Sequence, residues 1–359
     1  MNTTVQQKSN LGPKTNSSKR RSIMKRIIGI AAAVVSIGIL AGTASAGIVQ
    51  HVLVSDAENA RVLEFDLDGT YIGEFADFTG GRPAGIVQDS EYNIHIANAA
   101  DGGKIRQFST DGTEQTATFN GLTDVRPDDI AFNSSGQLFF GNPFGTAADG
   151  VYRVDTPSSA TEVLHDADFH GDPRGITFDG NGNLLVADRR LLDGQGELES
   201  FDPDDSFSSN GALITDEPNI QAPLYHNGSV FYTFHLGPDS NDPAGAGSGF
   251  RVREIASSDG SILNTYDAPD LLDDGDMLFD TIVLSDGDLL VTAYAGDAVL
   301  RLDPDTGTFT DFASGNFGGV TMDGPSYMSV MTIIPEPTTL ALLGLGVATL
   351  LGRRRRRRG

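Results

Sequence analysis

A phrase of about 17 residues recurs along the chain, and this repeat limits the fold more than any other feature of the sequence. Residues 82–98 (RPAGIVQDSEYNIHIAN), 126–142 (RPDDIAFNSSGQLFFGN) and 172–188 (DPRGITFDGNGNLLVAD) align without a gap. Weaker copies lie at 220–234 and 279–293. Each copy has two short apolar segments around a turn rich in Asp, Asn, Ser and Gly, which is the pattern of two strands joined by a tight turn.

A second phrase of strand, turn and strand follows each copy of the first. Its six copies begin at Arg61, Lys104, Gly150, Glu197, Arg251 and Val299. The matching apolar positions of the first phrase are spaced 44, 46, 46 and 60 residues apart, at Ile86, Ile130, Ile176, Ala222 and Ile282. The two phrases together make four antiparallel strands in about 46 residues, which is the size of a propeller blade.

The two ends of the repeat region complete each other. The first phrase has five full copies and the second has six, and residues 50–56 match only the second strand of the first phrase. The missing first strand occurs at 324–333, where Met328 lies 46 residues after Ile282. Pairing these ends removes an unmatched inner edge. We therefore predict an all-β, six-bladed propeller whose last blade takes strand A from 324–333 and strands B–D from 50–76, with helix only in the terminal segments.

The N-terminal segment has the pattern of an export signal. Lys25 and Arg26 precede an almost wholly apolar run at 27–40, and small residues follow it. A basic segment, an apolar segment and a small-residue cleavage site are typical of secretory signal peptides. We predict cleavage after Ala46, with Ala44 as the second recognition residue. The alternative is a retained membrane helix, although the run is shorter than the roughly 20 residues that span a bilayer.

The polar stretch before this signal leaves two starts open, Met1 and Met24. On either interpretation, the mature chain begins near Gly47. We expect three parts, namely a leader and signal peptide, the propeller and a sorting tail, at 1–46, 47–333 and 334–359.

The C-terminal tail combines three elements in a fixed order. Pro-Glu-Pro at 335–337 comes first, then an uncharged segment at 338–352, then six arginines at 353–358. As a helix the middle segment is about 22 Å long. That is shorter than the roughly 30 Å hydrocarbon core, but long basic side chains reach the interface. Arginines favour the cytoplasmic side, so the tail is expected to stop translocation and insert transiently in the membrane.

This order of elements resembles the PEP-CTERM sorting signal of bacterial exopolysaccharide-producing systems. The resemblance implies that an exosortase recognises the tripeptide and that the tail is removed as the protein is passed outward. The export machinery and the exosortase are then partners of the chain. The residues that the resemblance assigns to sorting and processing are Pro335, Glu336, Pro337, Arg353 and Arg354. A plain C-terminal membrane anchor is the alternative.

Charge is distributed unevenly along the 359 residues. The formal net charge is −24, but residues 47–334 hold 48 acidic and 12 basic side chains, a net charge of −36. Such a body repels nucleic acid and anionic lipid and attracts divalent cations, so we expect no nucleic-acid partner. The chain has no cysteine, which removes disulfides, thiolate catalysis and cysteine-type zinc sites.

The body also resembles six-bladed propellers of the NHL-repeat and gluconolactonase-like (senescence-marker) type, with PRGITFDGNGNLLVAD as the best match. In gluconolactonase-like enzymes a calcium ion held by Glu, Asn and Asp polarises a lactone. The resemblance places Asp128 and Asp280 on metal-ligand positions and Asp129 on the position of a catalytic aspartate. This chain departs from the family because Arg174 stands where a second Asn is expected, and an arginine repels Ca²⁺.

Loops longer than the fold needs are a second place for chemistry. The segment 165–172 offers carboxylates that suit calcium and imidazoles that suit a transition metal. The alternative is a solvated acidic loop. The candidate ligands are His165, Asp166, Asp168, His170 and Asp172. The segments 189–196 and 235–249 are further irregular loops at the same predicted face.

Charged residues just before each strand A are expected to point toward the central channel. They form a ring of mixed sign that includes Arg82, Arg126, Asp128, Asp129, Arg174, Asp280 and Asp323. No G-x-S-x-G, H-E-x-x-H, P-loop or G-x-G-x-x-G motif occurs. A Ser-His-Asp triad assembles in space and leaves no local motif.

Two functional hypotheses therefore stand side by side. The first is an exported protein of the cell envelope or extracellular matrix that binds extracellular polysaccharide or an envelope protein, with calcium as a possible cofactor. The second is a calcium-dependent lactonase or related hydrolase. A quinone-dependent redox enzyme ranks last, because the chain lacks the Trp and Cys common in such pockets.

Overall fold

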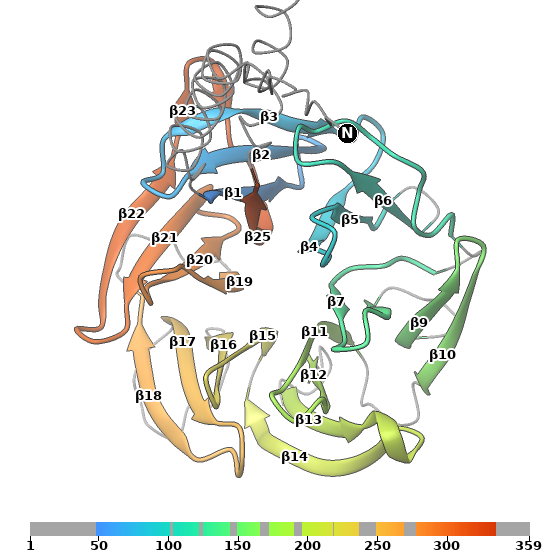
Figure 1. Ribbon diagram of the computed structural model, residues 1–359. Coiled ribbons are helices and arrows are strands. Elements are labelled where there is room, and N and C mark those ends of the chain that lie inside the picture. The colour runs from blue at the N-terminus through green and yellow to red at the C-terminus, as the bar shows by residue number, and fades with distance from the viewer. Residues whose placement is uncertain are drawn as a thin grey trace, which may run out of the picture. The chain divides into compact units, whose positions relative to one another are not determined.

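The computed structural model describes residues 48–100, 103–121, 125–143, 149–165, 172–189, 196–217, 219–236, 249–268 and 278–334, and all structural statements concern these residues. Five sheets of four strands and one of three are arranged as six blades around a central axis (Figure 1). Val49–Ile333 forms one compact unit. The predicted all-β, six-bladed propeller is confirmed.

In each blade the first strand (strand A) lies at the axis and the last lies at the rim (Figure 1). Blade 1 consists of β4 (Pro83–Gln88), β5 (Ile94–Asn98) and β6 (Lys104–Phe108). Blade 2 consists of β7 (Ile130–Phe132), β8 (Leu138–Asn142), β9 (Gly150–Thr156) and β10 (Ser159–His165). Blade 3 consists of β11 (Pro173–Phe178), β12 (Leu184–Asp188), β13 (Gly196–Asp202) and β14 (Ser208–Glu217).

The other three blades follow the same order. Blade 4 consists of β15 (Gln221–His226), β16 (Ser229–Leu236), β17 (Gly249–Ala256) and β18 (Ile262–Asp267). Blade 5 consists of β19 (Leu278–Val283), β20 (Leu289–Ala293), β21 (Ala298–Asp303) and β22 (Thr308–Ser314). Blade 6 consists of β25 (Pro325–Ile333), β1 (Val49–Asp56), β2 (Arg61–Asp66) and β3 (Tyr71–Asp77). A short 3₁₀ helix, η2 (Pro203–Asp205), and a hairpin of β23 (Asn316–Phe317) and β24 (Val320–Thr321) complete the described elements.

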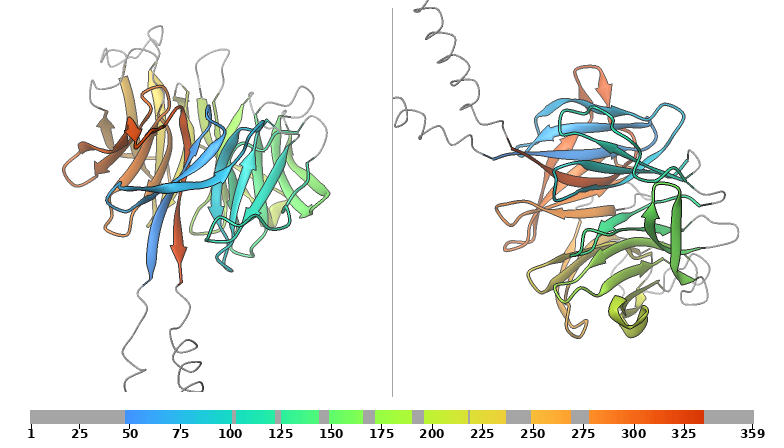
Figure 2. Two further views of the ribbon diagram at one scale, coloured as in Figure 1. Left: turned by 90° about the horizontal axis from the view of Figure 1, so that it is seen from above. Right: turned by 45° about the vertical axis from the view of Figure 1, so that its right-hand side comes forward.

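Blade 6 is built from both ends of the repeat region, as the sequence predicted. β25 and β1 are antiparallel partners, with Val54 opposite Met328 and Val49 opposite Ile333. Figure 2 shows the two strands side by side at one side of the disc. Met331 of β25 is fully buried among side chains of blades 6 and 1. The closure therefore joins the ring by main-chain pairing and by side-chain packing.

A bulge near the start of strand A recurs around the ring. Pro83, Pro173, Leu278 and Pro325 each pair with the residue at the end of strand B. Gln221 pairs with Thr233 inside β16, and in all five blades the register then shifts by one residue. The side chains equivalent to Ile86 are consequently Ile130, Ile176, Leu224, Thr281 and Met328. The sequence alignment that placed Ala222 and Ile282 at this position was wrong by two residues and by one. The bulge is common to these blades and does not cause the offset. In blade 5 the position is held by the polar Thr281, and in blade 4 the connection to strand B is three residues shorter, so matching apolar side chains selected Ile282 and Ala222 instead.

The Asn or Asp that ends strand B has a structural role in the repeat. Its side-chain oxygen accepts a hydrogen bond from the main-chain N–H that precedes strand A of the same blade. The distances are 2.8–2.9 Å for Asn98 to Arg82 N, Asn142 to Arg126 N, Asp188 to Asp172 N and Asp56 to Asp323 N. In blade 5 strand B ends with Ala293, and Thr292 Oγ1, one residue earlier, accepts from Asp280 N inside β19. These contacts fix where the inner strand begins.

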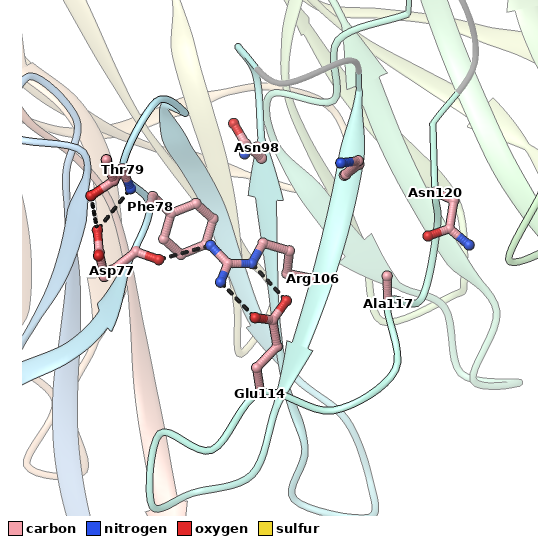
Figure 3. Close-up of a pocket in the computed structure, with 9 residues that line it drawn as sticks. Asp77, Phe78, Thr79, Asn98, Arg106, Glu114, Ala117 and Asn120 are labelled. Atoms are coloured by element: carbon pink, nitrogen blue, oxygen red, sulfur yellow. Dashed lines mark hydrogen bonds and ion pairs between the residues drawn. The ribbon is translucent and has the colours of Figure 1, made fainter.

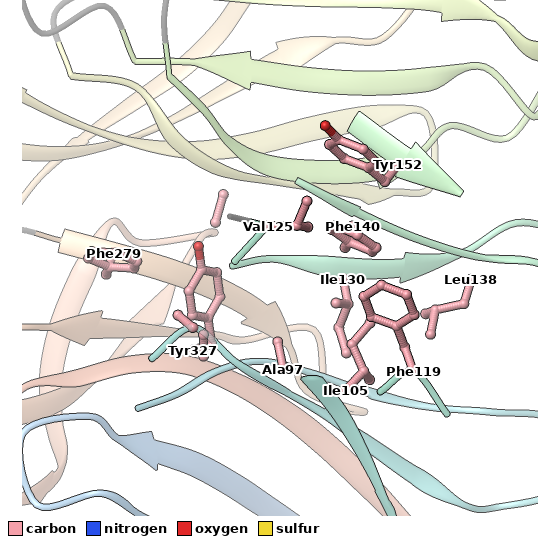
Figure 4. Packing of buried hydrophobic residues seen from close by; sticks show 13 residues of the cluster. Ala97, Ile105, Phe119, Val125, Ile130, Leu138, Phe140, Tyr152, Phe279 and Tyr327 are labelled. Carbon is pink, nitrogen blue, oxygen red and sulfur yellow. The ribbon is translucent and has the colours of Figure 1, made fainter. Parts of the chain in front are cut away.

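Blade 1 is the exception to the four-stranded pattern. The sequence predicted a fourth strand at 113–119, but only two isolated bridges form there, Phe108 with Glu114 and Ile105 with Phe119. Phe119 is nevertheless fully buried, and it lies beside Ile105 and Leu138 in the core between blades 1 and 2 (Figure 4). One aromatic side chain anchors a segment that is otherwise irregular.

Candidate functional site

Two aspartates link neighbouring blades at the axis. Asp129 Oδ1 accepts from Ile130 N and its Oδ2 accepts from Ile176 N of the next blade, each at 2.8 Å. Asp280 Oδ1 accepts from Thr281 N at 2.8 Å and its Oδ2 accepts from Met328 N of the next blade at 2.7 Å. The corrected register puts both aspartates at the same position of strand A. Each carboxylate therefore bridges two innermost strands that no further strand pairs with.

Asp128 lies next to this link and faces other partners. Its Oδ2 accepts from the Tyr327 hydroxyl at 3.0 Å and lies 3.9 Å from Arg174 Nη1. The same hydroxyl lies 3.3 Å from the main-chain oxygen of Arg174. Arg174 also donates from Nε to Asp172 Oδ2 at 3.2 Å. The structure thus brings Asp128, Arg174 and Asp172 together as a buried network of opposite charges.

Burial controls the protonation of this centre. It raises the pKa of Asp280 to about 7, against the effect of the two main-chain hydrogen bonds. Burial and the negative charge of Asp280 raise the pKa of Asp129 well above its ordinary value. The pKa of Asp128 is raised by burial too, although Arg174 and Arg82 oppose the shift. Carboxyl groups that are buried without a full counter-charge favour the neutral form.

Asp129 and Asp280 have a structural role, because each links the inner strands of two neighbouring blades. Both oxygens of each carboxylate accept main-chain N–H groups, and those N–H groups belong to strands at the inner edge of the ring. Unpaired main-chain groups in such a place are costly, so the carboxylates act as substitutes for a missing neighbouring strand. Within the described ranges, no group of three or more His, Asp or Glu residues is arranged to hold a metal ion. The assignment of Asp129 as catalytic, and of Asp128 and Asp280 as calcium ligands, stays a prediction.

The ends of the predicted loop site at 165–172 have ion-pair partners of their own. His165 Nδ1 lies 3.1 Å from Glu162 Oε2, and its side chain is 65% exposed. Asp172 is buried, and its Oδ2 lies 3.2 Å from Arg174 Nε and 3.9 Å from Arg189 Nε. The other three candidates, Asp166, Asp168 and His170, lie outside the described residues.

Only some of the charged residues that precede the strands A point toward the axis as predicted. Arg82 donates from Nη2 to the Tyr294 hydroxyl at 3.3 Å, and Arg174 is buried at the axis. Arg126 and Asp323 are exposed, and their main-chain N–H groups carry the contacts to strand B. The predicted cleavage residues Ala44 and Ala46 and the sorting residues Pro335, Glu336, Pro337, Arg353 and Arg354 lie outside the described residues.

A polar groove lies between the rim of blade 6 and blade 1 (Figure 3). Its volume is about 400 Å³, and it is lined by Asp77, Phe78, Thr79, Asn98, Lys104, Arg106, Glu114, Ala117 and Asn120. Arg106 holds the groove together. It donates to both oxygens of Glu114 at 2.9 and 2.8 Å and to Asp77 O at 2.8 Å. Its guanidinium carbon also lies 4.2 Å from the centre of the Phe78 ring.

Sequence reasoning missed this groove. Its residues come from three segments of blades 6 and 1 that lie in different copies of the repeat, and none forms a motif. The sequence feature that pointed to it was Arg106, a basic residue in strand C. Its partners Glu114 and Asp77 become known only once the packing of blades 6 and 1 is known.

Comparison with known protein families indicates where the chain is sorted. The model of the PEP-CTERM protein-sorting motif matches residues 334–357. The chain therefore carries a PEP-CTERM sorting signal, which implies export by an exosortase-dependent system to the cell envelope or extracellular space. No helix in the described part of the chain is long and apolar enough to cross a bilayer, and the predicted helix at 338–352 lies outside that part.

One solved structure with a TM-score above 0.5 supports the fold. A protein of unknown function from Bacteroides caccae is similar with a TM-score of 0.55 and 13% identity over 79% of this chain and 99% of that one. Hydrazine synthase from Kuenenia stuttgartiensis has a TM-score of 0.49 and 14% identity over 70% and 73% of the two chains. Virginiamycin B lyase from Staphylococcus aureus has a TM-score of 0.47 and 14% identity over 78% of each chain. No curated protein matches the sequence.

Proposed function

We propose that this chain is an exported propeller that binds a neutral polysaccharide of the cell envelope or extracellular matrix through the groove between blades 6 and 1. The PEP-CTERM signal supports the place of action, because it matches the C-terminal tail. The groove supports the ligand class. Its volume of about 400 Å³ falls in the range of small-molecule sites, roughly 300 to 1,000 Å³.

The lining of the groove suits sugar hydroxyls. Asn120 is exposed in the groove, and its amide both donates and accepts hydrogen bonds. The oxygen of Thr79 can still accept while its hydroxyl donates to Asp77 Oδ1. The ion pair between Arg106 and Glu114 is satisfied internally, so the groove offers no unbalanced charge from that pair. The rigid floor that Arg106 forms with Phe78 and Asp77 keeps the polar groups in place before the ligand arrives, which lowers the entropy cost of binding.

Electrostatics favours a neutral rather than an acidic polymer. The body has a net charge of −36 over residues 47–334, and a polyanion would be repelled at low ionic strength. Calcium bridges between the acidic surface and an anionic polymer are the competing explanation. An envelope protein as the ligand is the other alternative.

Affinity measurement on purified surface polysaccharide tests the proposal. We expect Ala117→Trp, which fills the groove, to weaken binding at least tenfold, whereas Ala212→Trp on exposed β14 of blade 3 leaves it unchanged. Binding is expected to persist when divalent cations are chelated. Equal affinity of the two variants, or loss of binding on chelation, would place the interaction on the acidic surface instead.

A further inference from the structure

His95 departs from the repeat at a core position. The side chains in the equivalent register of blades 2, 3, 5 and 6 are apolar and at most 1% exposed, namely Phe139, Leu185, Leu290 and Leu53. In blade 1 the same position holds an imidazole that is 4% exposed. Burying a polar ring costs free energy unless its nitrogen atoms are paired, so the position is informative.

Both nitrogen atoms of His95 have partners at short distance. Nε2 lies 2.9 Å from Asp89 Oδ2, and Nδ1 lies 2.6 Å from the Thr118 hydroxyl. Because a carboxylate only accepts hydrogen bonds, Nε2 carries the proton. Burial lowers the pKa of His95 more than Asp89 raises it, so the ring is neutral at pH 7. Nδ1 is then an acceptor, and the Thr118 hydroxyl donates to it.

The second departure from the repeat occurs at the same place. Blade 1 lacks the fourth strand that the other five blades have, and the irregular segment in its place carries Thr118. Thr116, Ala117 and Thr118 line a cavity of about 660 Å³ between blades 1 and 2. Phe132 and Leu138 line the other side, and the ring centre of Phe132 lies 5.1 Å from that of His95.

We propose that Thr118, His95 and Asp89 form a hydroxyl–imidazole–carboxylate relay that hydrolyses a carboxylic ester bound in this cavity. Thr118 is the nucleophile, His95 is the general base and Asp89 is a positioning residue that holds the ring through Nε2. This inference does not rest on the proposed polysaccharide binding, although Ala117 lines both the cavity and the groove. A hydroxyl next to a base that a third group orients is the arrangement that covalent acyl transfer needs.

The steps balance with water as the second reactant. Thr118 Oγ1 forms a bond to the ester carbonyl carbon while its proton passes to His95 Nδ1. The bond between the carbonyl carbon and the alcohol oxygen then breaks, and the alcohol leaves with that proton. Water attacks the acyl-threonine through the same base and releases the carboxylic acid. The main-chain N–H groups of Ala117 and Thr118, which have no acceptor among the described residues, are the donors we assign to the oxyanion.

Labelling of the full chain with p-nitrophenyl acetate and with a fluorophosphonate tests the relay. We expect both reagents to modify the tryptic peptide 107–153 at Thr118, and Thr118→Val to abolish the adduct. Thr113→Val, which removes another hydroxyl of the same peptide outside the cavity, is the matched control and should label like the parent chain. An adduct that survives in Thr118→Val, or no adduct in the parent chain, would overturn the proposal.

His95→Leu separates the chemical role from a structural one. Leucine is the residue of the repeat at this position, so the variant should fold with an unchanged or higher unfolding temperature. Its labelling rate should fall about 10²- to 10⁴-fold, which is the usual contribution of a general base. A variant that is folded and labels at the parental rate would show that His95 is only a packing residue.

Discussion

At the scale of single residues, Asp129 and Asp280 have a structural role at the axis that the sequence repeat does not reveal. Asp129 and Asp280 each accept two main-chain N–H groups from two different blades. Six blades meet at the axis with one unpaired strand edge each. A carboxylate is a compact way to satisfy such an edge without adding a strand.

Replacement of Asp280 tests this role. We predict that Asp280→Ala lowers the free energy of unfolding at pH 5 by about 1–3 kcal/mol, since buried donors lose their acceptors. Asp305→Ala, at an exposed turn of the same blade, should change it by less than about 0.5 kcal/mol. Denaturant titration of both variants measures the difference, and equal stability would contradict the linking role.

The protonation of Asp280 predicts a pH dependence with a definite sign. Burial raises its pKa to about 7 from an ordinary value of 3.8, so the folded protein keeps a proton that the unfolded chain has released between these pH values. The free energy of unfolding should therefore fall as the pH rises from about 4 to about 7. Asp280→Asn should reduce this slope, and Asp129 retains a part of it. A parent protein that becomes more stable over this range would contradict the assignment.

At the scale of elements, the sequence predicted the blades well and their bulges poorly. Gly, Asp and Asn turns separate the strands clearly, so blade number, strand order and the closure by 324–333 followed from spacing. The matched position of strand A is polar in blade 5, so a match of apolar residues placed Ile282 where Thr281 stands. The fourth strand of blade 1 was predicted because the second phrase recurs from Lys104, but Phe119 is the only described side chain of that segment that is fully buried.

The candidate sites were less accessible to sequence reasoning than the fold. His95 and Thr118 are 23 residues apart and meet because blade 1 lacks its outer strand. The groove depends on Asp77 of blade 6 and Arg106 of blade 1, which come together when the ring closes. A contact between blades decides the groove, and a contact within blade 1 between segments 23 residues apart decides the relay. No local sequence pattern encodes either contact.

The closing strand β25 should contribute as much to the free energy of unfolding as any strand of the core. Met331 of β25 is fully buried against Leu53, Ile94 and Ile96. We predict that Met331→Ala lowers the free energy of unfolding by about 2–5 kcal/mol, the usual cost of a large cavity in a core. Ile334→Ala, one residue beyond β25 and 52% exposed, is the control and should be nearly neutral. Chemical denaturation followed by circular dichroism gives both values.

At the scale of the whole molecule, the ring explains how an exported chain without cysteine stays folded. Each blade buries its faces against two neighbours, and the core divides into clusters that each join two or more blades. Closure of blade 6 by both ends makes the last interface possible. The groove lies between blades 6 and 1, so the proposed binding activity depends on that closure as well.

The absence of native cysteine offers the most direct test of the closure. Gln50 of β1 lies opposite Thr332 of β25, and opposite residues of antiparallel strands approach closely enough for a disulfide. We predict that oxidation of Gln50→Cys/Thr332→Cys cross-links the two strands within one chain, as seen by mass spectrometry of the tryptic digest. Gln50→Cys combined with Val330→Cys, two residues out of register, should cross-link far less. Efficient cross-linking of the second pair, or of neither, would contradict the six-bladed ring closed by its two ends.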